Sequence, residues 1–212
     1  MDRAEIALEP FYKALVCGNT MECRRITQYT LSREKDLTPV YENLFKPVLY
    51  KVGREWEYHR ISVAVEHMAT ALIESLMNEI FSDFIAPRRN NKGVVLASVQ
   101  NEEHQVGCRM VADTFEKSGW NSYFLGANTP VKDLVEFCKN VNPDAIGLSL
   151  SVYFNVDVFM DELEAIRKAT DLPILIGGQG LGKSGPLLAS KFDNVLFLRD
   201  IFQVEEYLKE LS

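Results

Sequence analysis

The chain has 212 residues, of which 47% are hydrophobic and 25% are charged, and its formal net charge at pH 7 is -7. This composition is that of an ordinary globular protein, long enough for one large domain or two small ones. The acidic balance argues against direct nucleic-acid binding, which normally needs a basic face. No apolar run reaches the roughly 20 residues that would span a membrane. Because the four cysteines lack C-x-x-C spacing and no signal peptide is visible at the first residues, we expect reduced thiols in a cytoplasmic protein.

The first part of the chain has helical periodicity. It predicts a helix over residues 4–16 and a second helix that starts with Thr20 as its N-cap. Thr38-Pro39 is typical of an N-cap followed by the first residue of a third helix, and a fourth is expected over 62–84. These helices predict a four-helix bundle as a domain over residues 1–86.

Residues 86–92 are polar and weakly basic, and we interpret them as a linker. Short apolar strands that alternate with helices follow, as expected for a parallel sheet covered on both faces. The predicted strands are 94–99, 121–125, 145–150, 174–176 and 195–198. The predicted helices are 104–118, 130–140, 156–169, 184–192 and 201–211. We therefore predict an α/β fold class: an N-terminal all-α part, then a Rossmann-like (flavodoxin-like) parallel-sheet domain over 93–212.

In sheets of this kind, ligands bind outside the carboxyl ends of the strands. Several small or polar residues are expected at that edge: His104, Gly126, Ser149, Ser151, Gly177 and Gly178. Two serines and two glycines would leave a slot beside the sheet that suits a long polar tail. Each of these pairs, taken alone, is more often an ordinary strand end or turn. Their convergence at one edge favours a ligand site.

His104 carries the chemistry of this edge. A histidine that follows a strand is most often an ordinary surface residue, and otherwise a general base or a metal ligand. Glu102, two residues earlier, favours the last interpretation because a carboxylate that accepts the other ring N–H orients the imidazole and makes it a better ligand. Gly107 allows close approach in the first helical turn. Since one histidine is too few for a zinc site, we expect a single axial bond to the metal of a macrocycle.

The spacing Glu102-x-His104-x-x-Gly107 resembles the first part of the signature of cobalamin-binding domains. The Ser149 segment and Gly177-Gly178 follow it in the order and spacing of that family, and the resemblance covers residues 93–212. It implies that His104 is the lower axial cobalt ligand in place of the cofactor's own benzimidazole. The displaced tail would then lie beside the two serines and the two glycines.

Two residues depart from this signature. Glu102 stands where methyltransferases and mutases of the family have aspartate, and glutamate here resembles the regulatory branch. Ser151 stands where the family's Ser-x-Leu element has its leucine.

A second resemblance lies in the helical part. Trp56 is followed after nine residues by Glu66-His67, which is similar to the W-x(9)-E-H pattern of cobalamin-dependent photoreceptors of the CarH type. The resemblance implies that Trp56 packs over the upper axial group and that the pair lies near the upper face. The histidine that follows the tryptophan in that family is Glu57 here. The helix-turn-helix domain of those repressors is not expected, because the sequence starts with the bundle.

These features predict a sensory cobalamin-binding protein without enzyme activity. It would sense light through the loss of an upper axial ligand such as the adenosyl or methyl group. Its output would pass to a signalling partner protein or to a homo-oligomer, with no direct nucleic-acid or membrane contact. A corrinoid methyl carrier that serves separate methyltransferases is the first alternative. A sensor that binds haem or a bilin, instead of cobalamin or together with it, is the second.

Overall fold

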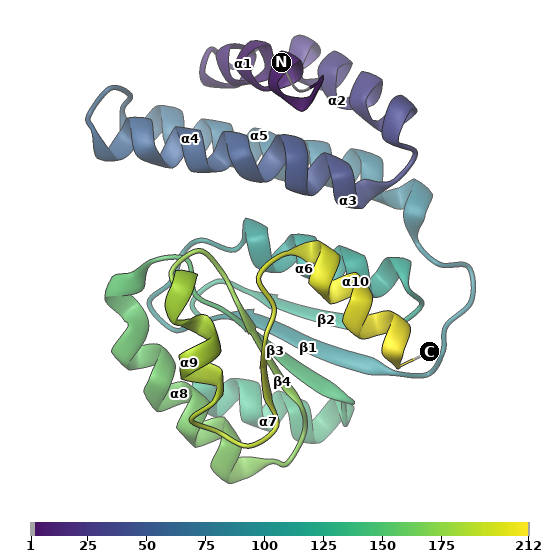
Figure 1. Ribbon diagram of the computed structural model, residues 1–212, viewed down its shortest axis with the longest axis vertical. Coiled ribbons are helices and arrows are strands. Elements are labelled where there is room, and N and C mark those ends of the chain that lie inside the picture. The colour runs from purple at the N-terminus through teal and green to yellow at the C-terminus, as the bar shows by residue number, and fades with distance from the viewer. Residues whose placement is uncertain (1–2, 212) are drawn as a thin grey trace. The chain divides into compact units, whose positions relative to one another are not determined.

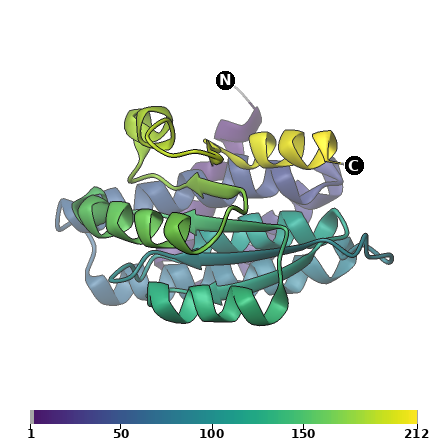
Figure 2. The same cartoon turned by 90° about the horizontal axis from the view of Figure 1, so that it is seen from below.

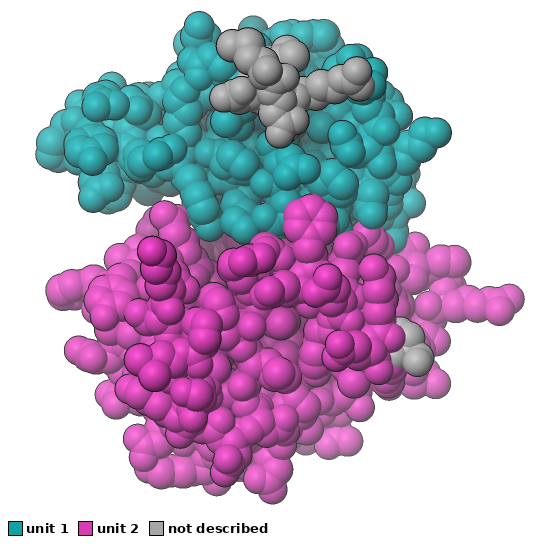
Figure 3. Space-filling model, in the orientation of Figure 1, with its two compact units in different colours: residues 1–84 teal, residues 85–212 magenta. Residues whose placement is uncertain are grey.

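The computed structural model describes residues 3–211 (Figure 1). The chain divides into two compact units, Met1–Phe84 and Ile85–Ser212 (Figure 3). Residues 1, 2 and 212, which the domains proposed above include, lie outside the described residues. The segment interpreted as a linker, residues 86–92, is bound to the rest of the second unit by a hydrogen bond: Arg89 Nη1 donates to the Trp120 carbonyl at 2.7 Å.

The first unit consists of helices, as its periodicity predicts. Helices α3, η1 and α4 follow one another without a break. The π-helical η1 ends at Phe45, two residues before Pro47, whose missing N–H a regular helix interior would not accommodate. The elements are α1 (Arg3–Val16), α2 (Thr20–Glu34), α3 (Leu37–Val40), η1 (Tyr41–Phe45), α4 (Lys46–Glu57), α5 (Val63–Phe81) and η2 (Ser82–Phe84).

The N-terminal caps of these helices correct two predictions. The N-cap of α2 is Asn19, whose Oδ1 accepts the Glu22 N–H at 3.1 Å, so Thr20 is already helical. Helix α3 begins at Leu37 after Asp36, one residue before the predicted cap Thr38. Ser62 is the N-cap of α5, since its Oγ accepts the Val65 N–H at 3.3 Å. Stacked aromatic rings, such as Phe11 and Phe45 with centroids 5.8 Å apart, fill the core between the helices.

The second unit is a five-stranded parallel sheet with strand order β2-β1-β3-β4-β5. This is the flavodoxin-like arrangement, so the predicted fold class is confirmed. The strands are β1 (Gly93–Ser98), β2 (Asn121–Gly126), β3 (Ala145–Ser149), β4 (Ile174–Gly177) and β5 (Val195–Phe197). The helices are α6 (Val106–Lys117), α7 (Val131–Val141), η3 (Tyr153–Asn155), α8 (Val156–Ala169), η4 (Gly182–Ser184), α9 (Gly185–Ala189) and α10 (Ile201–Glu210).

Helices cover both faces of this sheet (Figures 1 and 2). Alternate strand residues such as Val94 and Leu96 pack with α6 and α10, whereas Val95 and Ala97 pack with α7, α8 and α9. Strands β1, β3 and β4 are buried almost throughout, which explains why their sequences are apolar without alternation. Along the described part of the chain, no helix combines the length and the apolarity that a membrane crossing requires.

Candidate functional site

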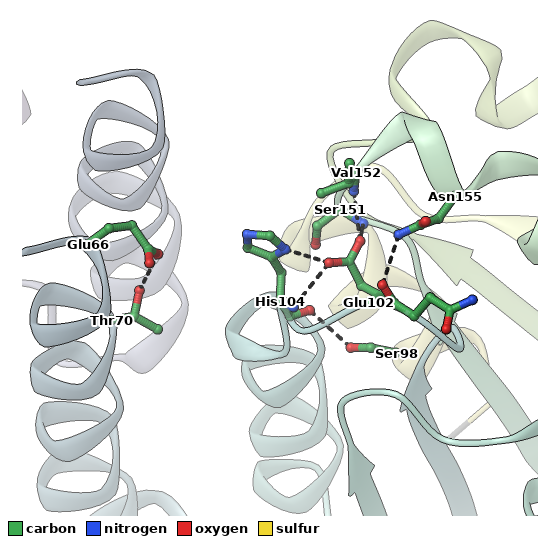
Figure 4. A network of polar contacts seen from close by, with 9 residues as sticks. Glu66, Thr70, Ser98, Glu102, His104, Ser151, Val152 and Asn155 are labelled. Carbon is green, nitrogen blue, oxygen red and sulfur yellow. Dashed lines mark hydrogen bonds and ion pairs between the residues drawn. The ribbon is translucent and has the colours of Figure 1, made fainter. Parts of the chain in front are cut away.

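The loops that follow β1 and β3 meet where the strand order reverses, because β1 lies between β2 and β3 in the sheet. Parallel sheets bind ligands at this switch point. The residue that joins the two loops is Glu102, whose side chain is only 1% exposed (Figure 4). Its Oε1 accepts the His104 ring N–H at Nδ1 over 2.5 Å and the His104 backbone N–H over 3.1 Å.

The second carboxylate oxygen of Glu102 reaches the β3 loop. Oε2 accepts the backbone N–H groups of Ser151 at 3.1 Å and Val152 at 2.8 Å. Burial acts to raise the pKa of Glu102, but the hydrogen bonds from His104 and Val152 and the attraction to the imidazole outweigh it, so the pKa lies below its ordinary value. Glu102 is therefore a buried carboxylate that fixes one loop to the other and orients the imidazole.

The imidazole of His104 is 55% exposed although its partner is buried. Ser98 Oγ donates to the His104 carbonyl at 3.1 Å, so the backbone is also fixed just before α6 begins at Val106. With Nδ1 held by the carboxylate, coordination of a metal by this ring would use Nε2. An oriented imidazole at a sheet edge can serve as a single axial ligand.

The predicted serines contribute in different ways. Ser149 is buried at the end of β3, and its carbonyl accepts the Val99 N–H at 3.1 Å. Ser151 joins the His104 network through its backbone N–H. No side-chain pattern in the sequence signals a bond of that kind. A contact between either hydroxyl and a cofactor tail stays a prediction.

The glycine pair at the end of β4 is explained by close contacts within the unit itself. Gly178 has φ +108°, and a Cβ there would lie 2.2 Å from the Leu150 carbonyl oxygen. A Cβ at Gly177 would lie 3.0 Å from the Leu198 carbonyl oxygen. The two glycines therefore let neighbouring backbone approach closely, and the slot for a tail stays a prediction. At Gly107, by contrast, a Cβ would meet no other atom within 4 Å.

Trp56, Glu66 and His67 belong to the first unit. Trp56 lies near the end of α4 and is 45% exposed, which is high for a residue of this size. In the first turns of α5, Glu66 Oε2 faces the His67 Nδ1 at 2.7 Å. The other oxygen, Oε1, accepts the Thr70 hydroxyl at 3.0 Å, the contact drawn in Figure 4. The imidazole of His67 is 74% exposed. This unit thus holds its own carboxylate-oriented histidine.

Two asparagines of the second unit, neither of them predicted as a site residue, belong to the network. Asn128 Oδ1 accepts the Asn101 N–H at 2.9 Å, and its own N–H donates to the Glu102 carbonyl at 3.0 Å. Asn155 Nδ2 donates to the Asn101 carbonyl at 3.2 Å. Each asparagine follows a strand by a few residues, which is the signal that could have found it.

These residues fit a planar, metal-bearing cofactor. A macrocycle supplies its own equatorial donors, so the protein needs to offer one axial donor, and His104 is an exposed imidazole whose ring is already oriented. Gly107 lies three residues after His104, and the open space beside it allows a large group to approach. The chemistry of the donor and the room beside it therefore agree with the predicted cofactor.

Comparison with known proteins agrees with this chemistry. Residues 92–197 match the family model of the B12 binding domain, and residues 7–80 match a second B12 binding domain model. Two repressors of Myxococcus xanthus are both 29% identical to the chain: HTH-type transcriptional repressor CarA over 68% of this chain and 49% of the relative, and HTH-type transcriptional repressor CarH over 65% and 46%. The chain thus spans about half the length of these relatives.

Two corrinoid proteins are also similar. Dimethylamine corrinoid protein 1 of Methanosarcina acetivorans is 27% identical over 62% of this chain and 61% of the relative. The solved structure of the Methanosarcina barkeri monomethylamine corrinoid protein has a TM-score of 0.81 and covers 100% of both chains at 12% identity, which shows a shared fold. The matches give no support to haem or a bilin as the cofactor. The chain therefore belongs to the family of cobalamin (B12) binding domain proteins.

Proposed function

We propose that this protein is a cobalamin-binding sensor of light that responds to the loss of the cofactor's upper axial ligand. The observation that carries the proposal is the arrangement in the first unit: an exposed Trp56 and a His67 oriented by Glu66. The spacing of these residues resembles the pattern of the CarH-type photoreceptors, and the similarity to CarA and CarH supports the same interpretation.

The second unit would hold the cofactor from below. His104 would be the lower axial ligand, with Glu102 keeping its ring oriented and Gly107 leaving room beside it. Ser149, Ser151, Gly177 and Gly178 would adjoin the displaced tail. When adenosylcobalamin or methylcobalamin is bound, it supplies a cobalt–carbon bond that light can break.

The first unit would contact the upper axial group and respond to its loss. We assign Trp56, Glu66 and His67 as its contacts there, because Trp56 exposes a large apolar ring and the pair holds an oriented imidazole. Loss of the upper group would remove an interaction that favours one conformation of the bundle and shift the population to another. This conformational change would alter the binding of a signalling partner protein or the oligomeric state of the acidic chain.

The test is illumination of the purified protein with adenosylcobalamin. We expect green light to change both the absorption spectrum and the elution volume, and Trp56→Ala to weaken the change in elution. Tyr29→Ala is the matched control, since it removes another exposed aromatic residue of the same unit. Identical spectra and elution volumes before and after light would refute the sensor proposal.

A corrinoid methyl carrier is the second candidate, favoured by the similarity to dimethylamine corrinoid protein 1. In that role the chain would hold the cofactor for separate methyltransferases and would catalyse nothing alone. Methyl transfer to the bound cofactor, with repeated turnover when a methyltransferase and its donor are added, would support the carrier. A light response without such transfer would support the sensor.

A further inference from the structure

The turn that leads from β1 to Glu102 leaves one backbone N–H without an acceptor inside the turn. The Glu102 N–H donates to the Val99 carbonyl at 3.1 Å, which closes a β-turn with Gln100 and Asn101 at its centre. Asn101 has φ +66°, the left-handed conformation that Asn tolerates at the third position of such a turn. The closing bond does not use the N–H of Gln100, so this donor requires a partner from outside the turn.

That partner is Glu162. Its Oε1 accepts the Gln100 N–H at 2.9 Å from the side of α8 that packs against the sheet, and the residue is only 5% exposed. The chain separates donor and acceptor by 62 residues, so α8 holds the turn from a distant part of the fold. The start of the same helix also holds Asn101, the next residue of the turn, because Asn155, just before α8, donates to the Asn101 carbonyl.

A carboxyl group in this position is costly. Burial raises the pKa of Glu162 to about 7, although the Gln100 N–H opposes the shift. An apolar residue would fill a helix face that packs on a sheet without this cost. Among the residues that the structure describes, the Gln100 N–H is the only hydrogen-bond partner of the Glu162 side chain, so holding the turn is the role that the geometry offers for this carboxyl.

We infer that Glu162 is a positioning residue for the cofactor ligand: it holds the turn at Gln100 from which Glu102 and His104 project. Without this acceptor the half-buried Gln100 N–H would have no partner in the protein, and the turn would rearrange to reach water. Because Glu102 takes its backbone direction from the turn, its carboxylate would lose the geometry that orients the His104 ring. The inference rests on the proposed role of His104 as axial ligand.

The test compares Glu162→Leu, Glu162→Gln and Glu162→Asp in the full chain. Gln keeps an acceptor oxygen at the same reach, Asp keeps the carboxyl on a side chain one carbon shorter, and Leu removes the acceptor. The probe is cob(II)alamin bound in the dark, and the readouts are its dissociation constant and its electron paramagnetic resonance spectrum. Labelling of histidine with nitrogen-15 changes the nitrogen splitting from a triplet to a doublet only when a histidine is the axial ligand.

We expect Glu162→Leu to weaken binding about tenfold or more and to reduce the fraction of cobalt that shows the histidine doublet. Glu162→Asp should change both readouts in the same direction by less, and Glu162→Gln should stay within about threefold of wild type. Glu164→Leu is the matched control, because it removes an exposed carboxylate from the same helix. If Glu162→Leu fails to fold, the contrast between Asp and Gln decides.

Two failures are distinguishable. A wild-type protein without the histidine doublet would overturn the proposed role of His104 itself. A wild-type doublet that persists at full intensity in every Glu162 variant, with unchanged affinity, would overturn the inference alone. Equal losses in Glu162→Gln and Glu162→Asp would also overturn it, since the acceptor oxygen would then not be what matters.

Discussion

The Oε2 atom of Glu102 accepts the Val152 N–H at 2.8 Å while Oε1 of the same carboxylate holds the His104 ring at 2.5 Å. One buried side chain thus orients the candidate metal ligand and connects the loops after β1 and β3. Its hydrogen-bond partners in the described part of the chain are all N–H donors, so the site depends on a group that can only accept.

Glu102→Gln tests this dependence. An amide presents one oxygen and one NH2 group, so one end of the Gln side chain would face N–H donors with a donor of its own. We expect a loss of about 1–3 kcal/mol in the free energy of unfolding and about 10- to 100-fold weaker cobalamin binding. Thermal denaturation of the apoprotein and spectral titration measure the two effects. Glu103→Gln, an exposed neighbour, should change neither, and a Glu102→Gln protein with native affinity would contradict the role of the carboxylate.

Two glycines near the site should respond in opposite ways to alanine. Gly178→Ala places a Cβ 2.2 Å from the Leu150 carbonyl oxygen at φ +108° and should cost more than about 2 kcal/mol of stability even without cofactor. Gly107→Ala meets no atom and lies in the first turn of α6, so it should leave the apoprotein equally stable or stabilise it by up to about 1 kcal/mol. If the space at Gly107 receives the cofactor, the same variant should weaken cobalamin binding. Unchanged affinity would remove Gly107 from the site.

The fold was predictable because its signals are local. Five apolar runs bounded by polar turns correspond to the five strands, and Ser62 marks the start of α5 by capping it. The errors at Thr20 and Thr38 have one origin: several residues in a row could cap each helix, and the sequence does not show whose side chain reaches the backbone.

The site was predictable only where its partners are near in sequence. Glu102 and His104 are two residues apart, so their contact follows from spacing. The bonds from Glu102 to Val152 and from Glu162 to Gln100 span 50 and 62 residues and end on backbone N–H groups, which carry no residue-specific signal. A glutamate in a helix is usually exposed, so nothing in the sequence separated Glu162 from its neighbours.

The chain has three histidines, which makes their tautomers measurable one by one. Carboxylates at Nδ1 of both His67 and His104 should hold the ring proton on that nitrogen. We expect nitrogen-15 spectra of the histidine-labelled apoprotein to show two Nδ1–H tautomers, with His59 as the internal reference. Glu66→Gln should shift the signals of His67 alone, and Glu102→Gln those of His104 alone. A His104 ring protonated only at Nε2 would contradict the orientation on which axial ligation depends.

Glu162 should also make the stability of the apoprotein depend on pH. Burial raises its pKa from 4.5 to about 7, so folding favours the protonated form. The stability that this group contributes is fully present below pH 4.5 and is lost as the pH rises through about 7, an effect of about 3 kcal/mol. Glu102 acts in the opposite sense, because its pKa is lowered: its contribution is present above its ordinary pKa and is lost only in acid.

Chemical unfolding of wild type and Glu162→Gln at pH 5 and pH 8 isolates the effect of Glu162. The amide does not titrate, so wild type should lose stability relative to Glu162→Gln as the pH rises, whereas the contribution of Glu102 is common to both and cancels. Glu164→Gln, on the exposed side of α8, should run parallel to wild type over this range, since the pKa of that carboxyl is lowered by its bond to Lys168. If the free energy of unfolding had the same pH dependence in wild type and Glu162→Gln, the Glu162 carboxyl would be hydrated in solution. The buried hydrogen bond to the Gln100 turn would then not exist.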